Sequence, residues 1–532
     1  MSENVEVEKT IQVLSSSKGK AASHVMHFAV SSSEQSLSLL ASREVLKNNN
    51  TPGMFELIKK YDQLTPELRE LLVANVEKLG LPIRMALLNE NSVVQDNAVN
   101  VIRELRPYSL IPLLLQHLEL GATSHLGIVQ WAVTHLADYF SQEFRGLVPR
   151  KPSYGYVLTS IVDALDRGFA SWQRHEREIF IDVFFRLSER LSTLSYATRE
   201  MTTNPHHPAH NAFARKLIGS QDPCVMRFLA RQLESTIAPN SLLVAAASRT
   251  DRAFVRMLLE TVGYSPAIML QKNLLHIRRF DWLDDIRSRL NGFDEGCHRF
   301  LVEMVYWSGL NENEKMLVYE NVLRFGGRAG KIATIEKLRQ SLTPNSDRLI
   351  LLAADGNDPE VQAAALSQLR TRNIKGATSK LLSYIDSPHQ EIRQVVSDEL
   401  IEFRLDRLLM SLDDLSEEQL RFMVRVVKKI DTNIQATITR ELENPNQPHK
   451  EFLLSLISEE RSVITYESSL MKLVENESDV FLRLNAVKML AFGILESSLR
   501  FLKITAERDQ DMEIRIMAQR VCEIREKAGK RK

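Results

Sequence analysis

The feature that most constrains this chain is an apolar pattern of helical spacing that returns about every 30 residues. In each copy, the third and the seventh residue after a starting position are apolar or small, so both lie on one face of a helix. In the C-terminal part, starting positions 27 to 33 residues apart are Gln362, Arg393, Leu420, Lys450, Arg483 and Arg515. Consecutive copies of this kind predict an array of repeated helical units.

Several of these helices open with residues that favour a helix start. Asp358 can accept hydrogen bonds from the free amides of the first turn, and Pro359 suits that turn. Ser387 takes the corresponding place in the next copy, and Asp479 and Asp511 take it further along. Shorter apolar helices lie between these copies, so each unit is predicted to be a helix pair.

The copies vary along the chain and predict its organisation. A weaker set begins at Ser38, Arg69, Gln95 and Gln130, and the spacing loosens beyond it. Turn-forming residues are dense over 146–155 and 201–210, which predicts two long loops. The predicted segments are a disordered or frayed N-terminus (1–25), an N-terminal repeat array (26–140), an irregular helical middle (141–345), a C-terminal repeat array (346–525) and a basic tail (526–532).

The predicted fold class is all-α. No stretch alternates apolar and polar residues between Asn-Gly or Asp-Gly turns, as hairpins would. The three cysteines are far apart and form no Cys-x-x-Cys pair, so neither a disulfide framework nor a cysteine zinc site is predicted. Lys and Arg number 68, as do Asp and Glu, and this balance counts against wholesale binding of nucleic acid.

The sequence also bears on location. The first nine residues are acidic where a targeting peptide would be basic. The longest apolar runs, such as 110–115 and 242–247, are far shorter than the ~20 residues of a membrane span. We therefore expect a cytoplasmic protein that does not insert into membranes.

The units over 353–400 and 475–525 resemble HEAT repeats, in particular the short kind grouped with the phycobilisome-lyase repeats. In that family the second helix opens with Asp or Asn, then Pro, then Val-Arg-x-x-Ala. Asp358, Pro359, Val361 and Ala365 match this pattern, whereas Gln362 replaces the arginine. The resemblance implies a right-handed α-solenoid, a superhelix of stacked HEAT-like helix pairs whose concave surface binds partners.

The resemblance also implies a structural ladder. In the family, the acidic residue at the helix start and the arginine a few residues later tend to bond between neighbouring repeats. The matching pairs in this chain are Asp386 with Arg393, Asp479 with Arg483, and Asp511 with Arg515.

Candidate metal ligands occur in one segment. His206, His207 and His210 are close in sequence, but the prolines among them favour an irregular loop, where helical spacing has no meaning. His175-Glu176 lacks the second histidine of the zinc-protease motif. HEAT-like deoxyhypusine hydroxylases use several His-Glu dipeptides to hold iron, whereas this sequence contains one. No metal site is predicted.

Other catalytic motifs are incomplete. The segment 325–332 resembles a phosphate-binding loop, but Ile332 stands where a hydroxyl should hold magnesium, and Gly326-Gly327 fits the end of a helix. Cys224, Cys297 and Cys522 lie on or beside apolar helix faces, as small buried residues do. No catalytic residue and no cofactor is therefore predicted.

Two basic features were weighed for polyanion binding. One is a predicted helix face formed by Arg421, Arg425, Lys428 and Lys429. The other is the basic tail, Arg525 to Lys532, which gives only a weak indication because such a segment frays. Separately, His276, Arg278, Arg279, Asp281 and Trp282 are similar in type to the groove residues of HEAT-like alkylpurine DNA glycosylases, but Asp284 and Asp285 follow and cancel the charge.

The sequence therefore favours a non-enzymatic scaffold or adaptor that binds unidentified protein partners through its concave surface. The alternative is a solenoid that binds nucleic acid or another polyanion through the local basic face, although the balanced charge disfavours it. A third hypothesis, an enzyme such as a lyase that acts on a tetrapyrrole, is supported only by the name of the repeat family.

Overall fold

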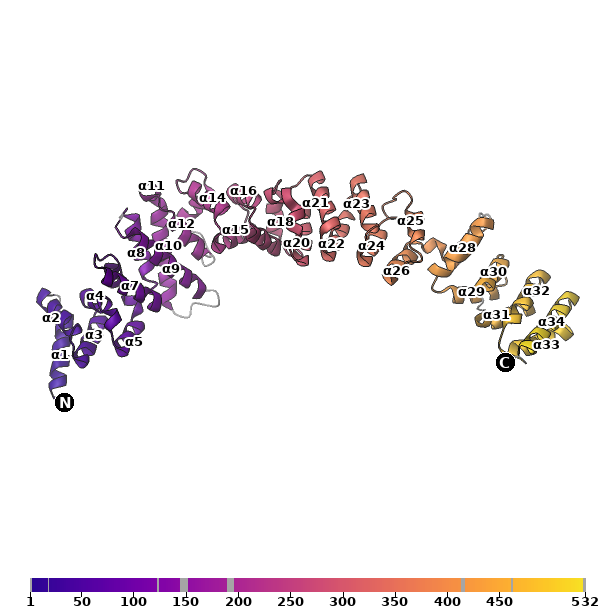
Figure 1. The fold of residues 1–532 in the computed structure, drawn as a ribbon, viewed down its shortest axis with the longest axis horizontal. Helices are drawn as coiled ribbons and strands as arrows, with labels where there is room; N and C mark the ends of the chain where they lie inside the picture. The colour runs from indigo at the N-terminus through magenta and orange to yellow at the C-terminus, as the bar shows by residue number, and fades with distance from the viewer. Residues whose placement is uncertain are drawn as a thin grey trace. The chain divides into compact units, whose positions relative to one another are not determined.

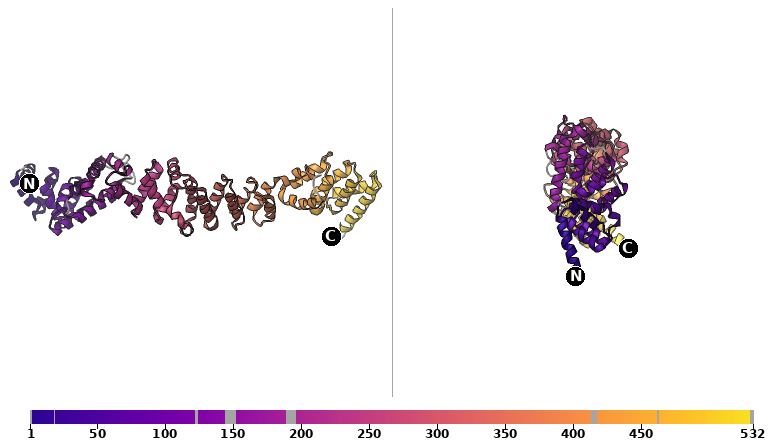
Figure 2. Two further views of the ribbon diagram at one scale, coloured as in Figure 1. Left: turned by 90° about the horizontal axis from the view of Figure 1, so that it is seen from above. Right: turned by 90° about the vertical axis from the view of Figure 1, so that its left-hand side faces the viewer.

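Helices form every regular element in the part of the chain that the structure describes. The computed structural model describes residues 2–17, 19–121, 124–143, 152–188, 196–412, 417–460 and 463–529. Among these residues there is no strand, and the ribbons consist of helices and the segments that join them (Figures 1 and 2). The predicted all-α class is thus confirmed.

The chain divides into two compact units. Unit 1 comprises Met1–Phe293 and Phe300–Val318, and unit 2 comprises Asp294–Arg299 and Tyr319–Lys532. The boundary passes through α20 (Glu295–Trp307) and α21 (Glu312–Phe325), which contribute residues to both.

The other helices of unit 1 vary from one turn to five turns. Their bounds are α1 (Ser2–Ser16), α2 (Lys20–Val30), α3 (Gln35–Lys47), α4 (Thr51–Lys59), η1 (Tyr61–Gln63), α5 (Pro66–Ala74), η2 (Val76–Lys78), α6 (Gly80–Leu87), α7 (Ser92–Leu105), α8 (Leu110–Glu119), α9 (Leu126–Glu143), α10 (Pro152–Ala170), α11 (Trp172–His175), α12 (Ile179–Leu187), α13 (Tyr196–Thr203), α14 (His210–Gly219), α15 (Pro223–Ser235), α16 (Asn240–Ser248), α17 (Arg252–Val262), α18 (Ile268–Leu275), η5 (Asp281–Asp285) and α19 (Ile286–Leu290).

The remaining helices belong to unit 2. Their bounds are α22 (Arg328–Leu338), α23 (Pro344–Ala354), α24 (Pro359–Leu366), α25 (Ala377–Ser383), α26 (Gln390–Glu399), η6 (Ile401–Phe403), α27 (Leu405–Leu408), α28 (Glu417–Ile430), α29 (Ile434–Glu443), α30 (Lys450–Glu460), α31 (Val463–Asn476), α32 (Val480–Met489), η8 (Leu490–Phe492), α33 (Glu496–Arg508) and α34 (Met512–Gly529).

Within each unit, helices pack against the next helix and against the next but one. In unit 1, α2, α4, α6, α8 and α10 follow one another in this way. In unit 2, α22, α24, α26 and α28 do so, as do α30, α32 and α34 (Figure 1). Alternate helices therefore share neighbours.

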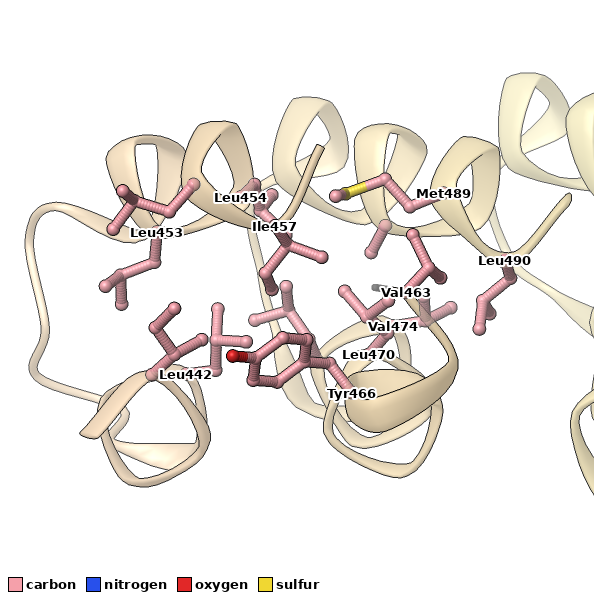
Figure 3. Close-up of a cluster of buried hydrophobic side chains, with 14 of the residues drawn as sticks. Leu442, Leu453, Leu454, Ile457, Val463, Tyr466, Leu470, Val474, Met489 and Leu490 are labelled. Atoms are coloured by element: carbon pink, nitrogen blue, oxygen red, sulfur yellow. The ribbon is translucent and has the colours of Figure 1, made fainter. Parts of the chain in front are cut away.

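The apolar register predicted from the sequence is the buried face of these helices. In the six C-terminal copies, every residue at the third and seventh position is buried except Met423, which is partly buried. Figure 3 shows part of the resulting core, where side chains of α29 to α32 meet around Tyr466 and Leu470. Each helix thus buries its stripe only by packing on its neighbours.

Three of the four predicted helix starts are confirmed. The carboxylate of Asp358 accepts hydrogen bonds from Glu360 N at 3.1 Å, and Asp479 and Asp511 make equivalent bonds of 2.7 and 2.8 Å to the amides two residues on. Ser387 is not a cap. Its hydroxyl accepts from His389 N, which forms a tight turn, and α26 begins afterwards at Gln390.

The N-terminal segment also differs from the prediction. We expected 1–25 to be disordered or frayed, but α1 and α2 are helices that pack on each other and on α3. Ile11 and Met26 are buried there. The prediction failed because the segment is polar and acidic overall. A few apolar side chains are enough to hold a helix in place when a neighbouring helix covers them.

Helices include part of each predicted loop. Residues 146–151 of the first lie outside the described part of the chain, and 152–155 belong to α10. The second loop is reduced to 204–209, because α13 extends to Thr203 and α14 begins at His210. By contrast, the helix end predicted at Gly326-Gly327 is confirmed, since α21 ends at Phe325 and α22 begins at Arg328.

Candidate binding groove

Of the three histidines considered as metal ligands, two have imidazole rings that bond to the backbone. His210 is buried, and its Nδ1 lies 2.9 Å from Met201 O. His207 Nδ1 accepts a hydrogen bond from Ala209 N at 3.1 Å. Within the described ranges, no group of three or more His, Cys, Asp or Glu side chains is arranged to hold a metal ion.

The first predicted ladder pair is not formed. Asp386 pairs with Lys429 of α28, whereas the guanidinium of Arg393 donates to Ser387 O at 2.7 Å. Arg393 therefore stabilises the turn that precedes its own helix, α26.

The other two arginines also bond to main-chain carbonyls. Arg483 Nε donates to Val474 O at 2.9 Å, in the last turn of α31, and its guanidinium also pairs with Asp509. Arg515 donates to Asp509 O at 2.6 Å. Arg483 thus links α32 to both neighbouring helices, while Asp479 and Asp511 serve as caps.

A different set of hydrogen bonds connects helices that are far apart in the sequence. The last carbonyls of a helix have no partner within that helix. In six places a polar side chain 32 to 40 residues later donates to one of them over 2.7–2.9 Å: Lys78 to Leu46, Asn97 to Lys59, Arg249 to Leu217, Asn273 to Leu233, Gln368 to Ile335 and Arg372 to Leu338.

Sequence reasoning missed these donors because it sought acid and arginine pairs. Most of them are buried, among them Asn97, Asn273 and Gln368. A polar residue inside an apolar helix face was the signal that could have revealed them.

The predicted basic face is partly neutralised. Lys429 pairs with Asp386, Arg425 is exposed and Lys428 is half-buried. Within the described residues, Arg425 and Lys428 make no ion pair. The side chain of Arg421 lies outside the described part. The face therefore offers fewer uncompensated charges than the sequence indicates.

A groove that the sequence did not predict lies within unit 1. It encloses about 530 Å³ between α9, α12 and α14. Its lining combines aromatic, amide, hydroxyl and charged side chains: Gln130, Trp131, Thr134, His135, Asp138, Glu178, Ile179, Asp182 and Lys216. We call it the α9–α12 groove.

One wall of the α9–α12 groove is built on an aromatic column. Trp131 and His135 stack with their ring centroids 5.0 Å apart, and Tyr139 meets His135 edge-on at 4.8 Å. These residues are four apart, so they line one face of α9. Arg103 of α7 lies over Trp131, at 5.3 Å from the ring centroid, and Arg106, which follows α7, lies over Tyr139 at 3.9 Å.

The surroundings of His135, in the middle of the aromatic column, favour a neutral imidazole. Burial lowers the pKa of His135, and the nearby Arg103 and Arg106 lower it further, against the opposing effect of Asp138. His135 Nε2 is buried and has no hydrogen-bond partner in the described part of the chain. A neutral imidazole therefore separates the two cations.

Carboxylates and cations alternate across the groove. Asp138 Oδ1 accepts from Arg186 Nε at 2.7 Å, and Asp182 Oδ1 accepts from Lys216 Nζ at 2.5 Å. Glu178 lies 3.4 Å from Lys216 and is about half exposed. These ion pairs join α9, α12 and α14, and they position carboxylates along the groove.

A second hollow, of about 680 Å³, lies in unit 2 beside α25 and α26. Its arginine, Arg370, pairs with Glu402 and bonds to Glu399 O. Burial raises the pKa of Glu399, and the adjacent Asp398 and Glu402 raise it further despite Arg370. This hollow has no aromatic lining, so the α9–α12 groove is the better candidate site.

None of the helices among the described residues is both long and apolar enough to cross a membrane.

Comparison with known proteins gives no family. No family model matches the chain, and no curated protein matches it. A search of solved structures returns a crystal structure described as that of an engineered protein, with 12% identity and a TM-score of 0.18, covering 95% of this chain and 98% of that chain. At such a TM-score the likeness carries no argument about the fold.

Proposed function

We propose that this chain is a right-handed α-solenoid of HEAT-like helix pairs that acts as a cytoplasmic, non-enzymatic scaffold or adaptor for protein partners. The observation that carries the proposal is the set of bonds from side chains to helix-terminal carbonyls one repeat earlier. Such bonds hold successive units in one register. A regular stack of this kind presents a long surface, and the α9–α12 groove is a hollow within it.

Small-angle scattering of the full chain tests the solenoid. A compact globule of this length has a radius of gyration of about 24 Å. A superhelical stack is extended, so we expect a value at least half as large again. A radius near that of the globule would overturn the solenoid.

Chemical cross-linking in the native cell, followed by reconstitution, tests the scaffold. Proteins cross-linked to the full chain are purified and mixed with it, and direct complexes are measured by calorimetry. We expect at least one complex that forms without nucleotide or other small molecules. If every cross-linked protein fails to bind the purified chain, the scaffold proposal is wrong.

The alternative proposal is polyanion binding by the basic face, favoured by Arg425, which is exposed and makes no ion pair with the residues that the structure describes. Its test is duplex DNA binding at low salt, comparing the wild type with the quadruple alanine variant of Arg421, Arg425, Lys428 and Lys429. Arg500→Ala is the control, because Arg500 is 80% exposed on another helix. Affinity lost in the quadruple variant alone supports this alternative, and equal, negligible affinity in all three proteins rejects it.

A further inference from the structure

The α9–α12 groove offers hydrogen-bonding groups that the protein itself leaves unused. Gln130 and Thr134 lie one turn apart on α9 and line the groove. Within the described part of the chain, neither side chain makes a hydrogen bond. Both are half-buried, so their positions are restricted by packing. An amide and a hydroxyl in this arrangement can bond to the carbonyl and amide groups of an extended peptide backbone.

The charge of the groove indicates the sign of its ligand. Three carboxylates and one ammonium group line it. Beyond the lining, Arg186 pairs with Asp138 and Asp222, Arg215 pairs with Glu178, and Arg103 and Arg106 lie over the aromatic column. Asp138 and Asp182 each use Oδ1 in an ion pair, and the Oδ2 atoms have no donor among the described residues. The groove thus retains acceptor capacity for a cation.

The aromatic column accommodates the aliphatic part of such a ligand. Arg103 and His135 both lie against the ring of Trp131. Trp131 and His135 of α9 line the groove together with Ile179 of α12. Apolar surface beside carboxylates suits a long side chain that packs its methylene groups and extends its charge to an acid.

We infer that the α9–α12 groove binds an extended, basic segment of a partner protein, with an arginine or lysine head placed between Asp138, Glu178 and Asp182. Gln130 and Thr134 hold the main chain of the segment. The inference rests on the proposed scaffold function and specifies one partner surface. Phosphate-bearing ligands are repelled by the same carboxylates.

The experiment uses the full chain and three fluorescent Gly-Ser nonapeptides, which carry three arginines, three glutamates or three glutamines. Binding is measured by anisotropy at about 20 and 200 mM salt. We expect the arginine peptide to bind more tightly than the others, and to weaken with salt because the charges are partly exposed. Hydrogen exchange with and without the peptide should show protection in α9 and α12.

Charge reversal at two neighbouring positions localises the effect. Glu178 lines the groove, whereas Glu176 is exposed two residues away and outside its lining. Glu178→Lys should weaken arginine-peptide binding about tenfold, and Glu176→Lys by less than about twofold, although both change net charge equally. Circular dichroism of both variants verifies that they are folded.

Each alternative result overturns the inference. It is wrong if the glutamate or glutamine peptide binds as tightly, if both reversals weaken binding equally, or if protection appears outside α9 and α12. A partner that binds the purified chain elsewhere leaves the scaffold proposal intact while this inference fails. Absence of any reconstituted complex contradicts the scaffold itself.

Discussion

Gly309 is a residue whose identity is set by a close approach of two backbone segments. Its amide donates to Leu274 O at 3.1 Å and to Ile277 O at 3.0 Å. A Cβ atom at this position would lie 2.2 Å from Leu275 O. Because the obstacle is main chain rather than a flexible side chain, a larger residue must move the end of α18 or lose both hydrogen bonds.

We therefore predict that Gly309→Ala destabilises unit 1 locally by roughly 1–3 kcal/mol, the usual cost of overpacking. Hydrogen exchange of the peptides covering α18 and the start of α21 measures it. Gly219→Ala is the matched control, since a Cβ there meets nothing within 4 Å, and it should leave exchange unchanged or slower. Equal acceleration in both variants would contradict this explanation.

The sequence did not predict the close backbone contact at Gly309. The double glycine at 326–327 was identifiable because a helix end is a local event. Gly309 meets a segment more than 30 residues earlier, and no pattern around it in the sequence indicates that contact.

At the scale of elements, two buried arginines perform the same task in the two units. Arg249 donates to Leu217 O at 2.7 Å and to Ser220 O at 2.8 Å. Arg372 donates to Leu338 O at 2.7 Å and to Ser341 O at 2.6 Å. Each also pairs with an aspartate, Asp251 in the first case and Asp347 in the second. A planar fork of donors can reach two carbonyls at once, which lysine cannot do.

Replacing either of these arginines should destabilise the folded protein. Arg249→Met or Arg372→Met leaves two main-chain carbonyls without their donor and removes the ion pair of a partly exposed aspartate, so we predict a loss of about 3 kcal/mol in each. Local hydrogen exchange in α14 or α22 reports it.

Arg256→Met is the control on α17, because Arg256 is 54% exposed and its pair with Glu260 lies on the surface. It should cost less than about 1 kcal/mol. If Arg249→Met proves no more damaging than this control, the carbonyl bonds do not hold the repeats together.

The whole molecule should respond to acid in two stages. Burial lowers the pKa of four histidines, all in unit 1: His117, His135, His175 and His207. Their folded-state pKa values lie below the ~6.5 of an unfolded chain. As the pH falls below that value, the unfolded chain takes up protons first, so unit 1 loses stability.

All but one of the carboxyls with a lowered pKa among the described residues lie in unit 2, the exception being the exposed Glu67 of unit 1. Hydrogen bonds from Arg348, Lys472 and Lys450 lower the pKa of Glu320, Glu443 and Glu477, respectively. These groups contribute stability above the unfolded pKa of about 4.3, and they lose it as the pH falls through their folded values.

At pH 5.5 compared with pH 7.5, we therefore predict lower hydrogen-exchange protection in unit 1 and little change in unit 2. Rates are corrected for the intrinsic effect of pH, and each unit serves as the control for the other. A decline of equal size in both units at pH 5.5 would show that the histidines do not set the response.

The sequence by itself determined the helical class, the apolar register and most helix starts. All three depend on residues within a turn or two of one another, so 3.6-residue periodicity and capping chemistry are enough to predict them. The burial of Ala365, Leu369 and their counterparts follows from that register.

Only the tertiary structure decided which groups of distant helices meet. Arg249 reaches a carbonyl 32 residues away, and the α9–α12 groove draws on residues from Gln130 to Lys216. Such contacts depend on how far each helix is shifted and rotated against the next. An apolar stripe leaves that shift undetermined, because many packings of two helices bury the stripe almost equally well. The polar hydrogen bonds between helices favour one of these packings.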